Sequence, residues 1–404
     1  MVRGREYLTP SDSARAGRVS LWKILSEYLL VGLTAFSMAI LQKLKLLVMR
    51  NRWLTEEEMN EGLALVQLYP GPIMVDFTAF VGYKLRGVPG ALMATTGFVL
   101  PSFVMMVALS ALYFAAASLS WIHLLFTGLE ALVIGVLLHV TIDMGERALR
   151  GRVEAAIALL AFGGLLFKLN AVWIVLAALP LGAFLIHPAE RTAALTHTET
   201  FVPARRWIGI AAVAIVMFCA VGFACSLRSD VGSLALSLFK IGAVAFGSGT
   251  TIIPLIQAEV VDAHHYLTLN QFADGIALGQ ITPGPFLITA AFIGYKMGGV
   301  FGAALATFAI FSPSIVMTLL FTELFLHVRT LKVVRGALAG VLASFVGMLA
   351  VVILHLGGVA LISPSAFVFA ALAFVAVRWF KLDIHWVFAG GLILWYGLMA
   401  LGFA

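Results

Sequence analysis

Long apolar segments alternate with short polar loops along almost the whole chain. Uninterrupted apolar segments cover residues 89–114, 121–143, 153–168, 171–187, 207–225, 301–326, 333–356, 363–378 and 384–403. Each of them approaches the ~20 residues that a helix needs to cross a bilayer. The pattern therefore predicts an all-α integral membrane protein.

Further apolar segments contain internal breaks. They are residues 24–49, broken near 34–38; 59–85, broken at Pro70-Gly71-Pro72; 234–261, broken at Gly247-Ser248-Gly249; and 270–297, broken at Pro283-Gly284-Pro285. Proline lacks an amide donor and glycine adopts conformations that other residues avoid, so both interrupt helices. Each broken segment either crosses the membrane or enters it and returns as a re-entrant hairpin.

The two halves of the chain are copies of one repeat. Beside the two Pro-Gly-Pro sequences, the matched pairs include Gly32 and Gly242, Phe36 and Phe246, Gln67 and Gln280, Gly82 and Gly294, Lys84 and Lys296, and Ser102 and Ser314. So many glycines and prolines in the same order indicate a duplication. We divide the chain into a cytoplasmic tail (1–20), a first repeat (21–190), a linker with one transmembrane helix (191–230) and a second repeat (231–404).

Basic residues favour cytoplasmic loops, and this bias predicts the orientation. Most of the 26 basic residues face the cytoplasm if the N-terminus is inside and the broken segments are hairpins. This arrangement has about nine full spans and four hairpins, or up to about 13 segments. Each repeat then crosses an even number of times and the linker crosses once, so the second repeat is inverted. The expected location is the cell (inner) membrane, with the N-terminus cytoplasmic and the C-terminus outside.

Breaks within a membrane indicate a buried polar site. Unpaired backbone groups are tolerated there only where protein buries them or where they line a water-filled cavity. Helix N-termini bind anions, and each break precedes a new helix start. We therefore expect an oxyanion site built mostly from neutral donors, although any single break is also explained as a packing kink. Its expected residues are Phe36, Ser37, Gln67, Pro70, Gly71, Pro72, Phe246, Gly247, Ser248, Gly249, Thr250, Gln280, Thr282, Pro283, Gly284 and Pro285.

Two acidic residues within apolar segments are candidates for a role in coupling. Asp76 lies just after the first Pro-Gly-Pro sequence. There it either caps the following helix, which is the simpler interpretation, or carries a coupling proton. Glu130 lies in the middle of an apolar segment without a basic neighbour. It is expected to be neutral, to pair with another helix or to couple a proton.

Three lysines are candidates for a role at the entrances to the anion site or in coupling. Lys84 and Lys296 occupy matched positions near the ends of broken segments. They either attract the anion at opposite entrances or anchor the chain at the membrane surface. Lys240 lies deeper and is expected to pair with Glu27 or with the anion.

Composition excludes several other classes. The 404 residues are 62% hydrophobic and 11% charged, whereas soluble domains carry about 25% charged residues. The net charge of +6 does not indicate nucleic-acid binding, because the basic residues are dispersed among membrane loops. The two cysteines form no metal or redox motif, and no cofactor or metal is expected. The expected partners are the lipid bilayer and a small inorganic oxyanion, with a homodimer as one candidate assembly.

The chain resembles the chromate ion transporter family in its long form with two homologous halves. The resemblance rests on Leu68-Tyr69-Pro70-Gly71-Pro72, Phe246-Gly247-Ser248-Gly249 and Ile281-Thr282-Pro283-Gly284-Pro285, and on the glycine-rich turn before Pro101-Ser102. It implies transport of chromate, with sulfate as a structural analogue, usually as efflux that gives resistance. One departure concerns the first break, where the family's usual Phe-Gly-Gly-Pro is replaced by Phe36-Ser37-Met38-Ala39.

Two alternatives belong to other functional classes. A channel or exchanger for another inorganic anion would use the same helix-end site. A membrane-embedded enzyme acting on a lipid phosphate would need a catalytic set. The sequence contains no H-E-x-x-H or G-x-S-x-G motif for one, so we expect no enzyme.

Overall fold

The computed structural model describes residues 19–36, 39–116, 120–186, 204–226, 230–247, 249–328 and 332–400. The first repeat contains α1 (Leu21–Thr34), α2 (Ala39–Arg50), α3 (Glu56–Leu65), β1 (Gly71–Pro72), α4 (Ile73–Ala115), α5 (Ser120–Ala148), α6 (Arg152–Leu166) and α7 (Ala171–Leu185). The linker contains α8 (Ala204–Ser226). Almost all of the expected tail, residues 1–18, lies outside the described residues.

The second repeat has the same succession of long helices but different short elements at its breaks. It contains α9 (Asp230–Ala243), β2 (Phe246–Gly247), η2 (Gly249–Ile252), α10 (Ile253–Gln257), η3 (Ala258–Ala263), α11 (Leu269–Ile281), η4 (Phe286–Ile288), α12 (Thr289–Val328), α13 (Lys332–Ala360), α14 (Pro364–Arg378) and α15 (Ile384–Ala400). The helices α5 and α13 each have 29 residues, and α6 and α14 each have 15. Matched helices of equal length agree with the duplication inferred from the sequence.

Four helices among the described residues are long and apolar enough to cross a membrane: Ile73–Ala115, Leu125–Ala148, Phe286–Leu324 and Val333–Ala360. Shorter apolar helices accompany them, including α7 with 15 residues and α15 with 17. A helix of 15 residues is about 22 Å long, less than the ~30 Å hydrocarbon core. The protein is thus an all-α membrane protein, while the full number of spans and the hairpins stay predictions.

Both long helices that follow Pro-Gly-Pro sequences are kinked at glycine. The α4 backbone leaves helical geometry at Arg86 and Gly87, and α12 does so at Gly298 and Gly299. Gly87 and Gly299 have φ of 63° and 57°, in the left-handed region that glycine adopts without steric cost. These kinks fall where the sequence predicts the broken segments to end and full spans to begin.

Glycine also allows the helices of each repeat to approach closely. A Cβ added at Gly32 of α1 would lie 2.4 Å from the Phe98 carbonyl oxygen in α4. At the matched Gly242 of α9, it would lie 2.2 Å from the Ile310 carbonyl oxygen in α12. Small residues let membrane helices pack backbone against backbone. The α1–α4 and α9–α12 pairs are therefore built in the same way.

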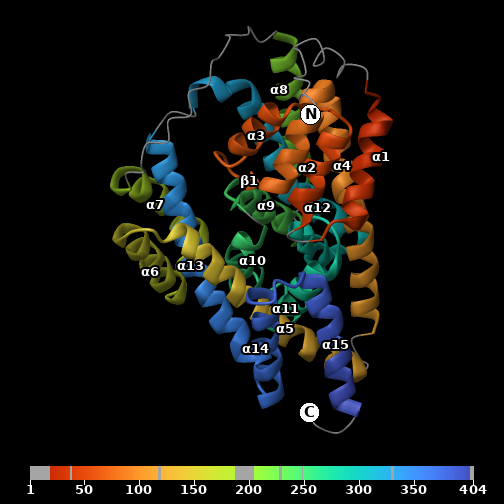
Figure 1. The fold of residues 1–404 in the computed structure, drawn as a ribbon, viewed down its shortest axis with the longest axis vertical. Helices are drawn as coiled ribbons and strands as arrows, with labels where there is room; N and C mark the ends of the chain where they lie inside the picture. Colours follow the sequence, from red (N-terminus) through yellow and green to blue (C-terminus); the bar gives the residue numbers. More distant parts are fainter. Residues whose placement is uncertain are drawn as a thin grey trace, which may run out of the picture.

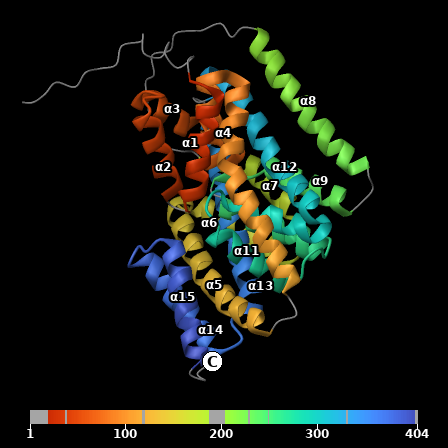
Figure 2. The ribbon, with the colours of Figure 1, turned by 90° about the vertical axis from the view of Figure 1, so that its right-hand side faces the viewer.

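The remaining helices of the two repeats are interleaved. The second repeat's α13 packs against α6 and α7 of the first, while the first repeat's α5 packs against α13, α14 and α15 of the second. Helices α1 to α3 lie towards one end of the long axis, α14 and α15 lie towards the other, and the long α4 extends from the first end along much of the molecule (Figure 1). Helix α8 runs along one side (Figure 2), where it contacts α9, α12 and α4. The two repeats therefore do not form separate bundles, because helices of each repeat pack between helices of the other.

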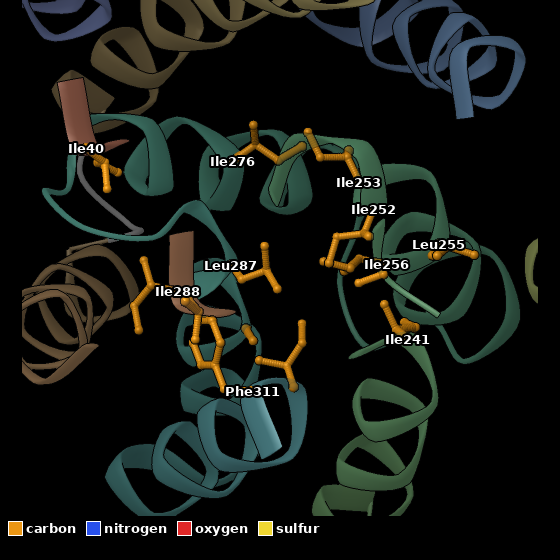
Figure 3. Packing of buried hydrophobic residues seen from close by; sticks show 14 of the residues in the cluster. Ile40, Ile241, Ile252, Ile253, Leu255, Ile256, Ile276, Leu287, Ile288 and Phe311 are labelled. Atoms are coloured by element: carbon orange, nitrogen blue, oxygen red, sulfur yellow. The ribbon is translucent and has the colours of Figure 1, made fainter. Parts of the chain in front are cut away.

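An apolar core surrounds the second repeat's breaks. Ile252, Ile253 and Ile256, from η2 and α10, lie on one side of Leu287 of η4, and Ile288 lies on its other side (Figure 3); all five side chains are buried. This arrangement encloses the irregular backbone in protein, away from lipid. Such enclosure is what non-helical backbone inside a membrane requires.

Candidate oxyanion site

The first repeat's Pro-Gly-Pro break meets the first break of the second repeat. Strands β1 and β2 pair in parallel, with Gly71 opposite Phe246 and Pro72 opposite Gly247. The Gly71 amide also donates to the Ala245 carbonyl oxygen at 2.5 Å. Backbone groups freed by one interruption are therefore satisfied by the other.

The reciprocal pair meets in the same way. The Gly284 amide, in the second Pro-Gly-Pro sequence, donates to the carbonyl oxygen of Ala35 at the first repeat's first break, at 2.8 Å. The two pairs are linked, because a Cβ at Gly249 would lie 2.3 Å from Leu287 Cδ1, just beyond Pro285. The structure therefore brings all four breaks together, each against a break of the other repeat.

Helix starts stand after the breaks, as the sequence predicts, but they differ between repeats. In the first repeat, α2 begins at Ala39 and α4 at Ile73. In the second, the 3-10 turn η2 begins at Gly249 and leads into α10 and the π-helical turn η3, while η4 begins at Phe286 and leads into α12. The expected regular half-helix after Gly249 is thus replaced by short irregular turns.

Threonine hydroxyls at and beside the breaks bond to backbone oxygens. Thr282 donates to the Leu278 carbonyl at 2.7 Å, and Thr34 donates to Leu30 within its own helix. Thr251, in η2, donates to the Phe246 carbonyl at 2.5 Å. Thr282 thus bonds to a carbonyl of its own helix, as threonine hydroxyls in helices commonly do, and its contact with an anion stays a prediction.

The two matched glutamines differ in environment. Gln280 is buried, and its Nε2 has no hydrogen-bond partner within the described parts of the chain. Gln67 is exposed. Gln280 is therefore the glutamine whose donor remains available inside the protein.

Other predicted site residues line the paired breaks. Pro72, Pro283 and Pro285 are buried, whereas Pro70, Gly249 and Thr250 are half-buried. Phe36 is half-buried, and its ring lies 4.9 Å from the His385 ring at the start of α15. Ser37 and Ser248 lie outside the described residues.

Asp76 accepts hydrogen bonds from the other repeat. Its side chain is fully buried, Ser314 Oγ donates to its Oδ1, and Thr318 Oγ1 lies 3.3 Å from the same oxygen. The N-cap of α4 is Pro72, without a side-chain cap. The capping interpretation of Asp76 is therefore wrong. Sequence analysis identified Ser314 only as a repeat match and missed Thr318.

Glu130 lies in a second acidic cluster. Its carboxyl lies beside Asp274 of α11, and the Tyr113 hydroxyl donates to Asp274 Oδ2 at 2.6 Å. The neighbour that the other helix supplies is thus acidic, and whether Glu130 is neutral, pairs with a further group or couples a proton stays a prediction. Asp274 was missed as a site residue because the sequence places it among acidic loop residues.

The lysines lie at the periphery. Lys84 is exposed, with its Nζ 5.7 Å from the Phe80 ring centre, and Lys296 donates to Gln271 Oε1 at 2.5 Å. Lys240 is exposed. Its expected pairing with Glu27 is wrong, because Glu27 pairs with Arg50 at 2.8 Å. Arg50, at the end of α2, lies nearer in the fold to Glu27 of the neighbouring α1.

A groove of about 240 Å³ lies between α4 and α12 and is lined largely by apolar side chains, with Thr95 and Thr307 among them. None of the predicted anion-site residues lines it. Across the described residues, no group of three or more His, Cys, Asp or Glu side chains is placed to hold a metal ion. That the paired breaks bind an anion stays a prediction.

Comparison with known proteins agrees with this architecture. The sequence model of the chromate transporter family matches residues 22–183 and 232–396. The chain is 30% identical to an uncharacterized transporter of Methanocaldococcus jannaschii, over 82% of this chain and 83% of that protein. It is 29% identical to the chromate transport protein of Cupriavidus metallidurans, over 88% and 86%, and 30% identical to that of Pseudomonas aeruginosa, over 81% and 79%.

No solved structure matches the chain. The two segments matched by the family model lie one in each repeat, and each contains a Pro-Gly-Pro break. The relatives cover four fifths or more of the chain, so the resemblance extends well beyond these motifs. The protein is therefore a multi-pass membrane protein that belongs to the chromate transporter family.

Proposed function

We propose that this protein is a secondary transporter that moves an oxyanion, chromate, out of the cell across the inner membrane, with sulfate as a competing analogue. Two relatives that are named chromate transport proteins support the substrate. The predicted orientation, with a cytoplasmic N-terminus, is part of the proposal.

The observation that carries the proposal is the reciprocal pairing of the breaks. Gly71 pairs with Phe246 across the repeats, and Gly284 donates to Ala35. Helices begin after Pro72 and Pro285, beside these paired breaks. The backbone amides at a helix N-terminus favour the binding of an anion. The buried Gln280 amide adds a neutral donor. A site held by both repeats changes its accessibility when their helices move.

The packing indicates which parts move. Helices α1 to α4 and α9 to α12 contain all four breaks, whereas α5 to α7 and α13 to α15 pack on one another across the repeats. Rocking of one whole repeat against the other, the simplest form of alternating access, would separate α13 from α6 and α7. We therefore propose that the break-containing helices move against the interleaved outer helices.

Voltage supplies a driving force for export. A dianion that leaves a negative-inside cell gains about 2.3 kcal/mol per charge for each 100 mV. This gain acts in the outward direction without any other energy source. Uptake against the same voltage would need a coupled ion.

Chromate flux into proteoliposomes tests the proposal. The wild type is expected to show saturable chromate flux that sulfate inhibits. Pro70→Ala and Pro283→Ala are each expected to lower this flux at least about tenfold. This loss corresponds to about 1.4 kcal/mol in the free energy of anion binding or of the transport barrier. Lys168→Ala, at an exposed loop position outside the site, is the matched control and should retain wild-type flux.

The other outcomes separate the alternatives. Folded wild-type protein that moves no chromate contradicts the proposed substrate. Flux that rises without saturation identifies a channel, and turnover of a lipid phosphate by the purified protein identifies an enzyme. Proline variants with normal flux would remove the paired breaks from the site.

A further inference from the structure

The matched serines of the two repeats bond to chemically different groups. Ser102 Oγ, in α4, donates to the Pro283 carbonyl oxygen of the second Pro-Gly-Pro sequence at 2.6 Å. Its match, Ser314 in α12, donates to the Asp76 carboxyl. The acceptor for Ser102 is thus a backbone carbonyl, which cannot ionise. The acceptor for Ser314 is a carboxyl group, which can.

The matched glycines Gly284 and Gly71 also face different side chains. A Cβ added at Gly284 would lie 1.9 Å from Ser102 Oγ, whereas one added at Gly71 would lie 2.1 Å from Asp76 Oδ2. The Asp76 carboxyl therefore occupies, against Gly71, the place that the Ser102 hydroxyl occupies against Gly284. It is interposed between Ser314 and the first Pro-Gly-Pro sequence.

The Asp76 carboxyl is enclosed and keeps one oxygen available. It has no exposed surface, and Oδ2 has no hydrogen-bond partner among the described residues. A buried carboxylate without a basic partner is costly, because it loses hydration that nothing replaces. A proton on Oδ2 removes this charge, while Ser314 and Thr318 continue to face Oδ1.

The titratable group that joins this network is Tyr69, whose hydroxyl donates to Thr318 Oγ1 at 3.0 Å. The charged or titratable groups on the elements around α4 have other partners or lie exposed. These are Glu27 with Arg50, Lys43 with the Thr34 carbonyl, Glu58 with the Thr55 amide, Tyr83 with Glu323, Tyr113 with Asp274, Lys296 with Gln271, and exposed Lys84. The exception is Tyr28 of α1, which is buried beside Trp53 and whose hydroxyl has no hydrogen-bond partner among the described residues.

We propose that Asp76 is a proton-binding site that couples proton movement to anion movement at the crossed breaks, which rests on the proposed function. The proton binds to Oδ2 and leaves from it, and no other bond forms or breaks. Because Asp76 touches Gly71, its negative charge would repel an anion at the break. The protonated carboxyl lacks this charge. Proton and anion therefore bind together and cross in the same direction. A dianion with one proton still carries one net negative charge, so the negative-inside voltage continues to favour its export.

Proteoliposomes that contain a pH-sensitive dye test the coupling, with chromate as the probe. In the wild type, chromate flux is expected to carry protons in a constant ratio. An imposed gradient of about one pH unit should change chromate accumulation by up to about tenfold per coupled proton. In Asp76→Asn, the proton-to-chromate ratio should fall to the background of empty vesicles and the response to the gradient should disappear.

Matched serine variants provide the control. Ser314→Ala removes a hydrogen bond to Asp76 and is expected to shift the pH at which chromate flux is half-maximal. Ser102→Ala removes the equivalent bond to Pro283 and is expected to lower flux while the proton-to-chromate ratio and this pH stay as in the wild type. Equal pH shifts in the two serine variants would overturn the assignment, as would an Asp76→Asn variant with the wild-type ratio.

A transport-independent measurement separates this inference from the proposed function. Infrared spectra of purified protein at neutral pH should contain a carboxylic acid C=O band that is absent from Asp76→Asn. The absence of this band from the wild type overturns the proton site. Wild-type protein that shows the band but moves no chromate supports the proton site and contradicts the proposed substrate.

Discussion

At the scale of single residues, Gly284 shows how tightly the crossed breaks are held. Its φ is 95°, a left-handed conformation that favours glycine. An added Cβ would also meet Ser102 Oγ at 1.9 Å. Gly299, at the α12 kink, has a φ of 57° but nothing within 4 Å of an added Cβ. A substitution at Gly299 therefore tests backbone strain alone, whereas one at Gly284 tests strain together with crowding.

We expect Gly284→Ala to destabilise the protein by at least about 2 kcal/mol, because strain and a clash add. Gly299→Ala should cost only about 1 kcal/mol, since the left-handed backbone is its main penalty. Thermal unfolding of the purified variants measures the difference. Combining Gly284→Ala with Ser102→Ala should recover part of the loss. Equal melting temperatures for the two glycine variants would show that the contact with Ser102 is not tight.

At the scale of elements, the contact between α7 and α13 depends on glycines facing one another. A Cβ at Gly340 of α13 would lie 2.5 Å from the Ala178 carbonyl oxygen and 2.7 Å from the Gly182 Cα in α7. Gly358, further along α13, has open space around its Cβ position. This is where the two repeats are joined outside the site.

Gly340→Ala is expected to separate α7 from α13 and to cost about 1–3 kcal/mol, as overpacking does. Gly358→Ala, on the same helix, should be neutral or slightly stabilising because alanine favours helix. Yield of monodisperse protein in detergent and its melting temperature are the measurements. A Gly340→Ala variant as stable as Gly358→Ala would contradict the close helix contact.

Helix ends could be predicted from the sequence, because proline and glycine act through local backbone geometry. The end of α1 at Thr34 and the start of α4 at Ile73 follow from this chemistry. Partners could not be predicted in the same way. The position of Asp76 in the first turn of α4 suggested that it caps this helix. Its hydrogen bond comes instead from Ser314, 238 residues further along the chain. Lys240 and Glu27 failed to pair for the same reason, since the neighbouring helix supplied Arg50.

At the scale of the whole molecule, neither repeat completes its own structure. The first repeat's breaks pair with those of the second, and α13 covers α6 and α7. The Pro-Gly-Pro motifs indicated a shared site, but the sequence did not reveal that the outer helices are interleaved. Helix order along a chain leaves open which neighbours meet in space.

Splitting the chain within the linker tests this interdependence. Fragments 1–203 and 204–404 are expected to be unstable when expressed separately, because each exposes unpaired break backbone. Co-expressed fragments should assemble, and a tag on one should co-purify the other. Their chromate flux should approach that of the intact chain. A first fragment that is monodisperse and stable on its own would contradict the interleaved fold.

The crosswise strand pair also bears on how such a protein arises. Among the described residues, each two-residue strand pairs with the strand of the other repeat. A chain with a single repeat would leave that strand unmatched. Under the inverted topology that the sequence predicts, it would complete the site beside a sister molecule inserted upside down in the membrane. Fusion of two such repeats through α8 would make this antiparallel partnership permanent, so that every molecule would carry both orientations in equal number.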